Sequence, residues 1–242
     1  MISKNYIKLI HALERKKIRD EEGKFVIEGE KMVLEILKWK SDSLIHVFHT
    51  EAFNDSISNF DSSKCTQISE KELKAISRLQ TPNKVLAILD KWETIDINAD
   101  FYLALDGVQD PGNMGTIMRL ADWFGVPEII CSKETVDCYN PKVVQATMGA
   151  IFRVQVRYED LGTYLPKLNL PIYGALLEGE NVYKTNLTPN GILVLGNEGK
   201  GISQAIQEII DKPICIPRFG EAESLNVSTA GAILLSEFYR SI

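Results

Sequence analysis

The stretch that decides the fold prediction covers residues 214–228, Ile214-Cys-Ile-Pro-Arg-Phe-Gly-Glu-Ala-Glu-Ser-Leu-Asn-Val-Ser228. The apolar run Ile214–Ile216 predicts a buried strand, and Pro217 ends it because proline has no N–H to donate to a sheet. From Ser224 onward, apolar residues recur at helical spacing, which predicts a helix. At a helix start, free backbone N–H groups and the side chains of Ser224 and Asn226 can hold a ligand. Taken alone, the stretch also fits a capped helix without a ligand.

Two other stretches have the same strand–turn–helix pattern. An apolar strand at Phe101–Asp106 leads into Gly107-Val-Gln-Asp-Pro-Gly-Asn-Met-Gly-Thr-Ile-Met-Arg119, and the other stretch is Leu195-Gly-Asn-Glu-Gly-Lys-Gly-Ile202. Turns at the carboxyl ends of parallel strands are where α/β proteins bind ligands. Neither G-x-G-x-x-G after the first strand nor G-x-x-x-x-G-K-[ST] is present, so the spacing supports neither a dinucleotide fold nor a P-loop.

The order of the expected elements predicts an α/β protein with two domains. Strands and helices alternate through residues 1–90, which predicts a small α/β domain. Its first helix is expected at Ser3–Lys17, followed by a turn at residues 19–24. The polar segment 91–99 is the best candidate for a linker, and residues 100–242 form the second α/β domain.

The charge distribution gives a mixed indication about nucleic acids. The net charge of −6 argues mildly against a general nucleic-acid binder. Residues 1–97 carry 16 Lys/Arg and 16 Asp/Glu, so the excess acid lies in the remainder, with 11 and 17. A local basic cluster lies within the first twenty residues, and a solvated helix face explains it equally well. The members of this cluster are Lys4, Lys8, Arg15, Lys16, Lys17 and Arg19.

The remaining composition argues against metal and membrane functions. The four cysteines are scattered, with no C-x-x-C pair and no histidines at metal spacing, which predicts free thiols in a reducing cytosol. No apolar run approaches the ~18 residues of a membrane span, and no signal peptide is apparent. The sequence therefore predicts a cytoplasmic protein without a metal. The cysteines are Cys65, Cys131, Cys138 and Cys215.

Together, the three stretches resemble the motifs of the SpoU (TrmH-like) RNA 2′-O-ribose methyltransferases. The motifs are Asn-x-Gly-x-x-x-Arg at 113–119, Leu-Gly-Asn-Glu-Gly-x-Gly at 195–201, and Ile-Pro with Glu-Ser-Leu-Asn-Val-Ser at 216–228. We call them the first, second and third motifs. Gly149-Ala-Ile-Phe-Arg153 also matches the family's core. The resemblance covers essentially the whole chain, because four further segments resemble that family's N-terminal RNA substrate-binding domain, which is related to ribosomal protein L30e. These segments are Lys17-Ile-Arg19 with Phe25-Val-Ile-Glu-Gly29, and Thr81-Pro82 with Val85-Leu-Ala-Ile88.

The resemblance implies an S-adenosylmethionine-dependent enzyme that works as a homodimer. Its C-terminal half would be a SPOUT-type α/β fold with a mostly parallel sheet and a deep trefoil knot, preceded by the small L30e-like α/β domain. In this family the cofactor sits against the loops of the second and third motifs. Carried over to this sequence, the cofactor-binding residues are Leu195, Gly196, Asn197, Gly199, Ile216, Pro217, Ser224 and Leu225.

The resemblance also implies roles in methyl transfer to a ribose 2′-hydroxyl, which is an in-line displacement at the sulfonium methyl. The family gives the central role to the first-motif arginine, sometimes as general base. A guanidinium with a pKa above ~12 is a poor base, so anchoring a phosphate and stabilising developing alkoxide is the other possible role. The expected catalytic residues are Asn113, Arg119, Glu198, Ser224 and Asn226, and the expected RNA contacts are Lys16, Lys17 and Arg19.

Four functions remain open at this level. The N-terminal domain favours ribosomal RNA of the large subunit as the substrate over transfer RNA, because the minimal tRNA enzymes tend to lack that domain. An inactive RNA-binding assembly factor of the same fold is the alternative from another class, although the intact motifs argue against it. A small-molecule nucleotide binder would suit the acidity but not the basic first helix.

Overall fold

The computed structural model describes residues 1–240. Contacts divide the chain into two compact units, one of residues 1–93 with 139–152 and one of residues 94–138 with 153–242. The expected domains 1–90 and 100–242, with a linker at 91–99, stay a prediction. No helix within residues 1–240 is long and apolar enough to cross a membrane.

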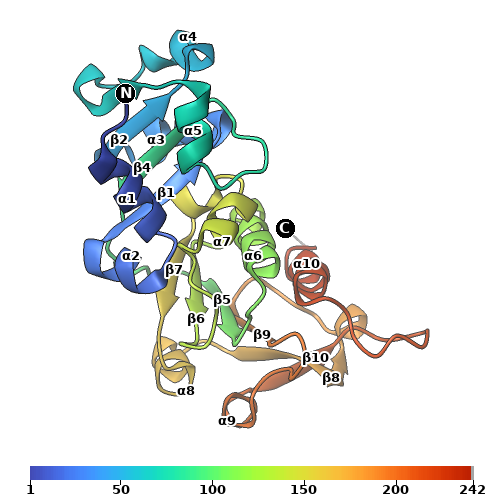
Figure 1. The fold of residues 1–242 in the computed structure, drawn as a ribbon. Helices are drawn as coiled ribbons and strands as arrows, with labels where there is room; N and C mark the ends of the chain where they lie inside the picture. The colour runs from blue at the N-terminus through green and yellow to red at the C-terminus, as the bar shows by residue number, and fades with distance from the viewer. Residues whose placement is uncertain (241–242) are drawn as a thin grey trace. The chain divides into compact units, whose positions relative to one another are not determined.

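The first unit is built around a four-stranded mixed sheet in the order β1-β4-β2-β3 (Figure 1). Strand β4 pairs antiparallel with both β1 and β2, and β3 joins β2 in parallel. On one side, Ile10 of the first helix and Leu13 just after it pack with Phe48 and Ile88 of the sheet. The elements are α1 (Lys4–Ala12), α2 (Lys16–Glu22), β1 (Lys24–Glu28), α3 (Glu30–Trp39), β2 (Leu44–His49), α4 (Asn54–Ile57), β3 (Cys65–Gln67), α5 (Glu70–Ile76), β4 (Val85–Asp90) and α7 (Pro141–Ala146).

The N-terminal segment differs from the expected single helix. Helix α1 ends at Ala12, and α2 occupies residues 16–22, where the sequence predicted mainly a turn. The reason is a tertiary contact: the guanidinium of Arg19 donates to the carbonyl oxygens of Leu13 (2.9 Å) and Glu14 (2.7 Å), just past the end of α1. These carbonyls lack helical partners, so the buried arginine stabilises the corner between the helices. Gly23 then ends α2 in the left-handed conformation, at φ 63°.

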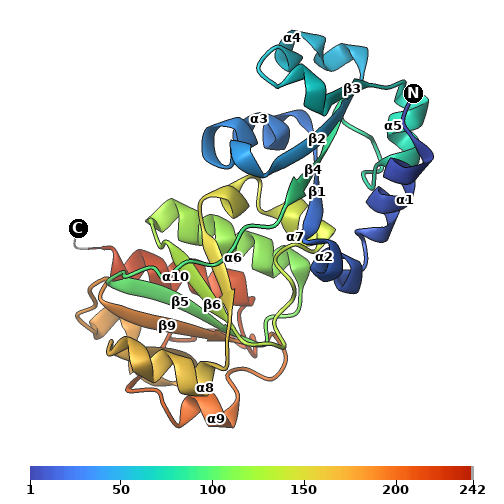
Figure 2. The same ribbon diagram turned by 90° about the vertical axis from the view of Figure 1, so that its left-hand side faces the viewer.

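The second unit is a six-stranded parallel sheet in the order β10-β8-β9-β5-β6-β7. The expected α/β class with a parallel sheet is confirmed. Figure 2 shows α6 and α10 on one face of the sheet and α8 and α9 on the other. The elements are β5 (Phe101–Asp106), α6 (Pro111–Phe124), β6 (Glu128–Cys131), β7 (Gln155–Tyr158), α8 (Leu161–Tyr164), β8 (Ile172–Asn181), β9 (Gly191–Gly196), α9 (Gln204–Gln207), β10 (Lys212–Cys215) and α10 (Val227–Phe238).

Both helices on the site-bearing face have clear start signals. Helix α6 begins where the Asp110 side chain accepts the N–H of Asn113 (2.8 Å), with Pro111 as its first residue. Helix α10 was expected from Ser224 but starts at Val227, because Asn226 is the residue whose side chain caps the first turn. The preceding strand ends at Cys215, one residue before the expected end. A loop of residues 216–226 therefore separates β10 from α10.

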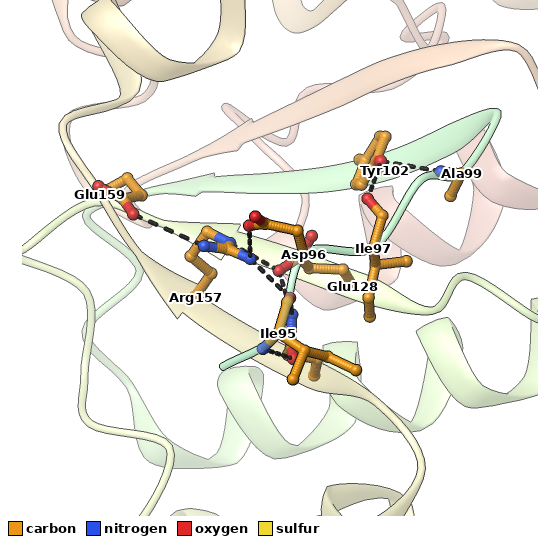
Figure 3. A network of polar contacts seen from close by, with 9 residues as sticks. Ile95, Asp96, Ile97, Ala99, Tyr102, Glu128, Arg157 and Glu159 are labelled. Carbon is orange, nitrogen blue, oxygen red and sulfur yellow. Dashed lines mark hydrogen bonds and ion pairs between the residues drawn. The ribbon is translucent and has the colours of Figure 1, made fainter. Parts of the chain in front are cut away.

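Part of the expected linker is held on the edge of the second unit's sheet (Figure 3). The Gln155 side chain accepts the N–H of Ile95 (2.9 Å) and donates to its carbonyl oxygen (2.8 Å). Arg157 donates to the same carbonyl (2.7 Å) and to the carboxylate of Glu128 (2.8 Å), which is 1% exposed. Ile95 and Asp96 are thus held by side chains of β7, and the carbonyl of Ile97 accepts the hydroxyl of Tyr102 from β5 (2.7 Å).

Candidate functional site

The first and second motifs lie at the carboxyl ends of two neighbouring strands. Strand β5 pairs in parallel with β9, and Asp106 at the end of β5 lies opposite Gly196 at the end of β9. The loops that follow these strands, residues 107–110 and 197–203, therefore start side by side. This is the edge at which parallel α/β sheets bind ligands.

The second-motif loop is a tight turn that needs glycine. Asn197 and Gly201 exchange two backbone hydrogen bonds of 2.9 Å. A Cβ on Gly196 would lie 2.3 Å from the carbonyl carbon of Gly201, so a side chain cannot be placed there without moving the backbone. Gly201 has φ +70°, a conformation that side-chain-bearing residues rarely adopt. The geometry of this turn thus explains why residues 196 and 201 are glycines.

A chain of three side chains joins all three motifs. Asn113 of the first motif donates through Nδ2 to Glu198 Oε1 of the second (3.0 Å). Asn226 of the third motif donates through Nδ2 to Asn113 Oδ1 (2.8 Å). We call Glu198, Asn113 and Asn226 the amide cluster. The sequence predicted these three as site residues, and the structure brings them together.

Glu198 of the second-motif loop accepts hydrogen bonds at the start of α6. Besides Asn113, its carboxylate accepts the backbone N–H groups of Gln109 (3.4 Å) and Asp110 (3.2 Å). Burial raises the pKa of Glu198, but the hydrogen bonds from Asn113 and the backbone outweigh it, and the pKa lies below its ordinary value of 4.5. A carboxylate near a helix N-terminus is also favoured by the helix dipole. Glu198 therefore stays ionised and holds the second-motif loop against α6.

Ser228 belongs to the same arrangement, and the sequence analysis did not single it out. Its hydroxyl donates to Asn226 Oδ1 (2.6 Å) and lies 3.5 Å from Asn113 Oδ1. The same Asn226 oxygen accepts the N–H groups of Ser228 (2.9 Å) and Thr229 (3.3 Å). Its place at the end of the third motif was the available signal. These contacts fix which way the Asn226 amide faces.

Two expected catalytic residues are not joined to the amide cluster. Arg119 is exposed on α6, and within residues 1–240 it makes no hydrogen bond or ion pair. Ser224 is exposed in the loop before α10 and likewise has no partner among the described residues. Both are thus available to a ligand. Glu198 does not contact Arg119, so its observed role is to brace the loop.

The expected cofactor-binding residues form two groups. Leu195 is buried in β9, and Gly196, Asn197 and Gly199 follow it in the second-motif turn. Ile216 and Pro217 are half-buried and Leu225 is 48% exposed, in the 216–226 loop. Among the described residues, the backbone of 216–225 makes no backbone–backbone hydrogen bond outside the regular elements. This loop offers apolar surface together with open backbone groups.

The three expected RNA contacts have different environments in the first unit. Lys16 forms an exposed ion pair with Asp20 (2.6 Å), and Lys17 forms one with Glu21 (3.7 Å). Arg19 is 2% exposed and donates to carbonyls inside the unit, so its guanidinium cannot reach a phosphate in this conformation. Lys16 and Lys17 remain accessible.

Within the described part of the chain, no group of three or more His, Cys, Asp or Glu residues could hold a metal ion. The site is instead made of amides, one carboxylate, glycine-rich backbone and an unpaired arginine. Its position at the carboxyl edge of a parallel sheet defines the chain as a ligand-binding α/β protein.

Comparison with known families assigns the chain more closely. Residues 100–236 match the SpoU rRNA Methylase family, and residues 4–87 match the MRM3-like substrate binding domain. The chain therefore belongs to the SpoU rRNA methylase family, which confirms the resemblance predicted from the three motifs.

Individual relatives are similar to this chain over nearly its full length. The 23S rRNA (guanosine(2553)-2′-O)-methyltransferase RlmP of Bacillus subtilis is 32% identical over 92% of this chain and 91% of the relative. A solved structure of a putative RNA methyltransferase of the TrmH family from Porphyromonas gingivalis is 38% identical, covers 100% of both chains and has a TM-score of 0.91. The AdoMet-bound rRNA methyltransferase from Sinorhizobium meliloti is 28% identical, with a TM-score of 0.87 over 100% of this chain and 97% of that one.

Proposed function

We propose that this protein transfers the methyl group of S-adenosylmethionine to a ribose 2′-hydroxyl of large-subunit ribosomal RNA. The observation that carries the proposal is the amide cluster, because it ties the three family motifs into one site at the carboxyl edge of β5 and β9. Proteins named as 23S rRNA 2′-O-methyltransferases are similar to this chain in sequence, and one of the solved structures similar to it is AdoMet-bound.

The residues present suit the cofactor. The apolar surface of Ile216, Pro217 and Leu225 suits an adenine ring, and the open backbone of residues 216–225 offers hydrogen-bonding groups. Leu195, Gly196, Asn197 and Gly199 would hold the cofactor from the second-motif side, and Ser224 from the third. When bound, the cofactor supplies an electrophilic methyl group on a sulfonium.

Arg119 is the proposed catalytic arginine. Its guanidinium is exposed and uncommitted within the described residues, so it can bind a phosphate beside the target ribose and stabilise the developing alkoxide. A guanidinium is a poor general base because it holds its proton firmly and has no lone pair to accept another. We therefore propose an electrostatic role for Arg119.

The amides position the ribose. An amide Nδ2 carries two protons, and the hydrogen bonds within the cluster use one each on Asn113 and Asn226. The second proton of each amide can donate to ribose oxygens. Glu198 orients Asn113 by accepting from it, and Ser224 is a further hydroxyl available to the ligand.

The RNA partner and the assembly state follow from the same family assignment. The MRM3-like substrate binding domain at residues 4–87 supports structured RNA as the partner, with Lys16 and Lys17 as phosphate contacts. Arg19 is left out of this set because it is buried. We also propose a homodimer, a trefoil knot in the second unit and a cytoplasmic location, on the resemblance stated above. A dimer would place two basic segments on one particle, which suits an acidic RNA enzyme.

Tritium transfer from labelled S-adenosylmethionine tests the proposal. The acceptors are unmodified rRNA, tRNA and large-subunit assembly particles, with Arg119→Ala and Arg119→Lys as paired variants. Alkali-resistant label on rRNA or particles, lost in Arg119→Ala, is the expected result. Label on tRNA alone would assign the tRNA activity. Cofactor binding without label on any acceptor would indicate an inactive assembly factor.

A further inference from the structure

Two buried hydroxyl groups outside the three motifs contact the backbone at the end of β5, just before the first motif. Ser132 follows strand β6 and Thr135 lies three residues later, with exposures of 6% and 5%. A backbone hydrogen bond from Thr135 N to Ser132 O (3.1 Å) forms a turn, and the two hydroxyl oxygens are 3.3 Å apart. We call Ser132 and Thr135 the hydroxyl pair.

The hydroxyl pair holds the chain where it leaves the sheet after β5. The N–H of Gly107 donates to Ser132 Oγ (3.0 Å) and to Thr135 Oγ1 (3.2 Å). The Thr135 hydroxyl in turn donates to Leu105 O (3.0 Å). Gly107 follows the last residue of β5, and its N–H has no backbone acceptor among the described residues, so it needs another acceptor. The hydroxyls supply that acceptor.

The same segment also holds a peptide further along this loop. Val136 N donates to Val108 O at 2.9 Å, so the 108–109 peptide plane is held, as is the 106–107 plane that carries the Gly107 N–H. The plane between these two carries the Gly107 carbonyl, so its direction is restricted from both sides. That carbonyl accepts Asn197 Nδ2 at 2.7 Å.

Asn197 connects the Gly107 carbonyl to the second-motif loop through its side-chain amide. Its Oδ1 accepts the N–H groups of Gly199 and Lys200, both at 3.0 Å. At the other end of the loop, the N–H of Ser203 donates to Asp106 Oδ2 at 2.7 Å. Residues 106 and 107 therefore hold both ends of the loop, and the Asn197 side chain is engaged with protein groups on both its nitrogen and its oxygen.

We propose that Ser132 and Thr135 are positioning residues for the cofactor, acting through Gly107 and Asn197 on the shape of the second-motif loop. This inference rests on the proposed function, because it takes that loop as part of the cofactor site. It also gives Asn197 a role as the link between the first and second loops.

Cofactor affinity measured by calorimetry tests the inference, with Thr135→Val and Ser132→Ala separately and together in the full chain. Valine keeps the shape of threonine without its hydroxyl. We expect the double variant to bind S-adenosylmethionine about tenfold more weakly, as loss of a buried hydrogen bond implies. Thr135→Ser keeps the hydroxyl and should bind as the wild type does. RNA affinity should be unchanged in all of them.

A matched control and a coupling measurement separate positioning from general destabilisation. Thr147→Val removes another buried hydroxyl, which donates to Val144 O in the first unit, and should leave cofactor affinity unchanged. Asn197→Ala combined with Thr135→Val should weaken binding less than the sum of the single changes, because both act through one path. Amide hydrogen exchange should show faster exchange at Gly107 in Thr135→Val even if global stability falls.

The outcomes distinguish the two proposals. If the wild type binds cofactor and the double variant binds it equally well, or if the effects of Thr135→Val and Asn197→Ala are fully additive, the positioning role is wrong. If the wild type itself does not bind S-adenosylmethionine, the proposed function is wrong, and the exchange rate at Gly107 still reports on the hydroxyl pair.

Discussion

Replacing Glu198 with Gln tests whether the three motifs act as one unit. The carboxylate accepts hydrogen bonds from Asn113 Nδ2 and from the N–H groups of Gln109 and Asp110. Gln keeps one oxygen acceptor but loses the negative charge at the start of α6. Hydrogen bonds to a charged group contribute roughly 1.5–3 kcal/mol when buried. The glutamate is partly solvated, so screening lowers that figure to about 1.4 kcal/mol for the exchange.

That free energy converts to a kinetic expectation. A loss of about 1.4 kcal/mol corresponds to about a tenfold fall in kcat/KM for methyl transfer if the amide cluster must be ordered in the transition state. The assay is tritium transfer to the RNA acceptor at subsaturating RNA. Glu221→Gln is the matched control, since Glu221 is exposed in the 216–226 loop and has no partner among the described residues. Equal kcat/KM for Glu198→Gln and Glu221→Gln would refute the reasoning.

The lowered pKa of Glu198 adds a pH signature. A carboxyl whose folded pKa is depressed contributes stability above its unfolded value of 4.5 and loses it as pH falls through the folded value. The free energy of unfolding of the wild type should therefore exceed that of Glu198→Gln at neutral pH. The two curves should approach each other as pH falls below 4.5 and converge below the lowered folded pKa, where the glutamate is neutral in both states. A constant difference down to acid pH would contradict the assignment.

Three other changes have defined outcomes. Arg157→Leu leaves the carboxylate of Glu128, which is 1% exposed, without its ionic partner, and should lower the free energy of unfolding in urea by about 3 kcal/mol. Gly196→Ala places a Cβ 2.3 Å from the Gly201 backbone, so cofactor binding measured by calorimetry should be lost. Lys16→Ala with Lys17→Ala should weaken RNA binding and, for two lost phosphate contacts, reduce the slope of log affinity against log salt by roughly 1.4–1.8.

The glycine and lysine changes each have a control on the same unit. Gly220→Ala adds a methyl group where a Cβ meets nothing within 4 Å, and should leave cofactor affinity unchanged. Lys71→Ala with Lys74→Ala removes two exposed lysines from α5 and should leave the salt slope unchanged. If the Lys16→Ala, Lys17→Ala variant keeps the wild-type salt slope, Lys16 and Lys17 do not contact RNA phosphates.

A continuous apolar run made one strand of the parallel sheet predictable. Phe101–Asp106 has the bounds that the sequence indicated, because the run is apolar and the Gly- and Pro-containing turn follows it. The helix at Lys16–Glu22 was missed because its own Arg19 folds back and satisfies the carbonyls of Leu13 and Glu14 just past the first helix, a contact that no pattern of residue types reveals. The start of α10 shifted by three residues because Asn226, rather than Ser224, supplies the capping oxygen.

The sequence likewise identified some residues of the site, whereas others are apparent only in the structure. Asn113, Glu198 and Asn226 could be singled out because they lie in short motifs, and hydrogen bonds connect them. The hydroxyl pair could not be found in this way. Ser132 and Thr135 have a role only because the N–H of Gly107 has no backbone acceptor among the described residues, which no local pattern reveals.

The acidity of the second half has a structural explanation near the site. Asp106, Asp110 and Glu198 each accept a backbone N–H at the start of a loop or helix. Their charges are therefore partly balanced by N–H dipoles, including those at the N-terminus of α6. These carboxylates still disfavour a phosphate nearby, so an RNA backbone needs a cation that is not already paired. Arg119 on α6 has no ionic partner among residues 1–240, which is why we expect its loss to reduce methyl transfer more than the loss of a lysine that has an acidic partner.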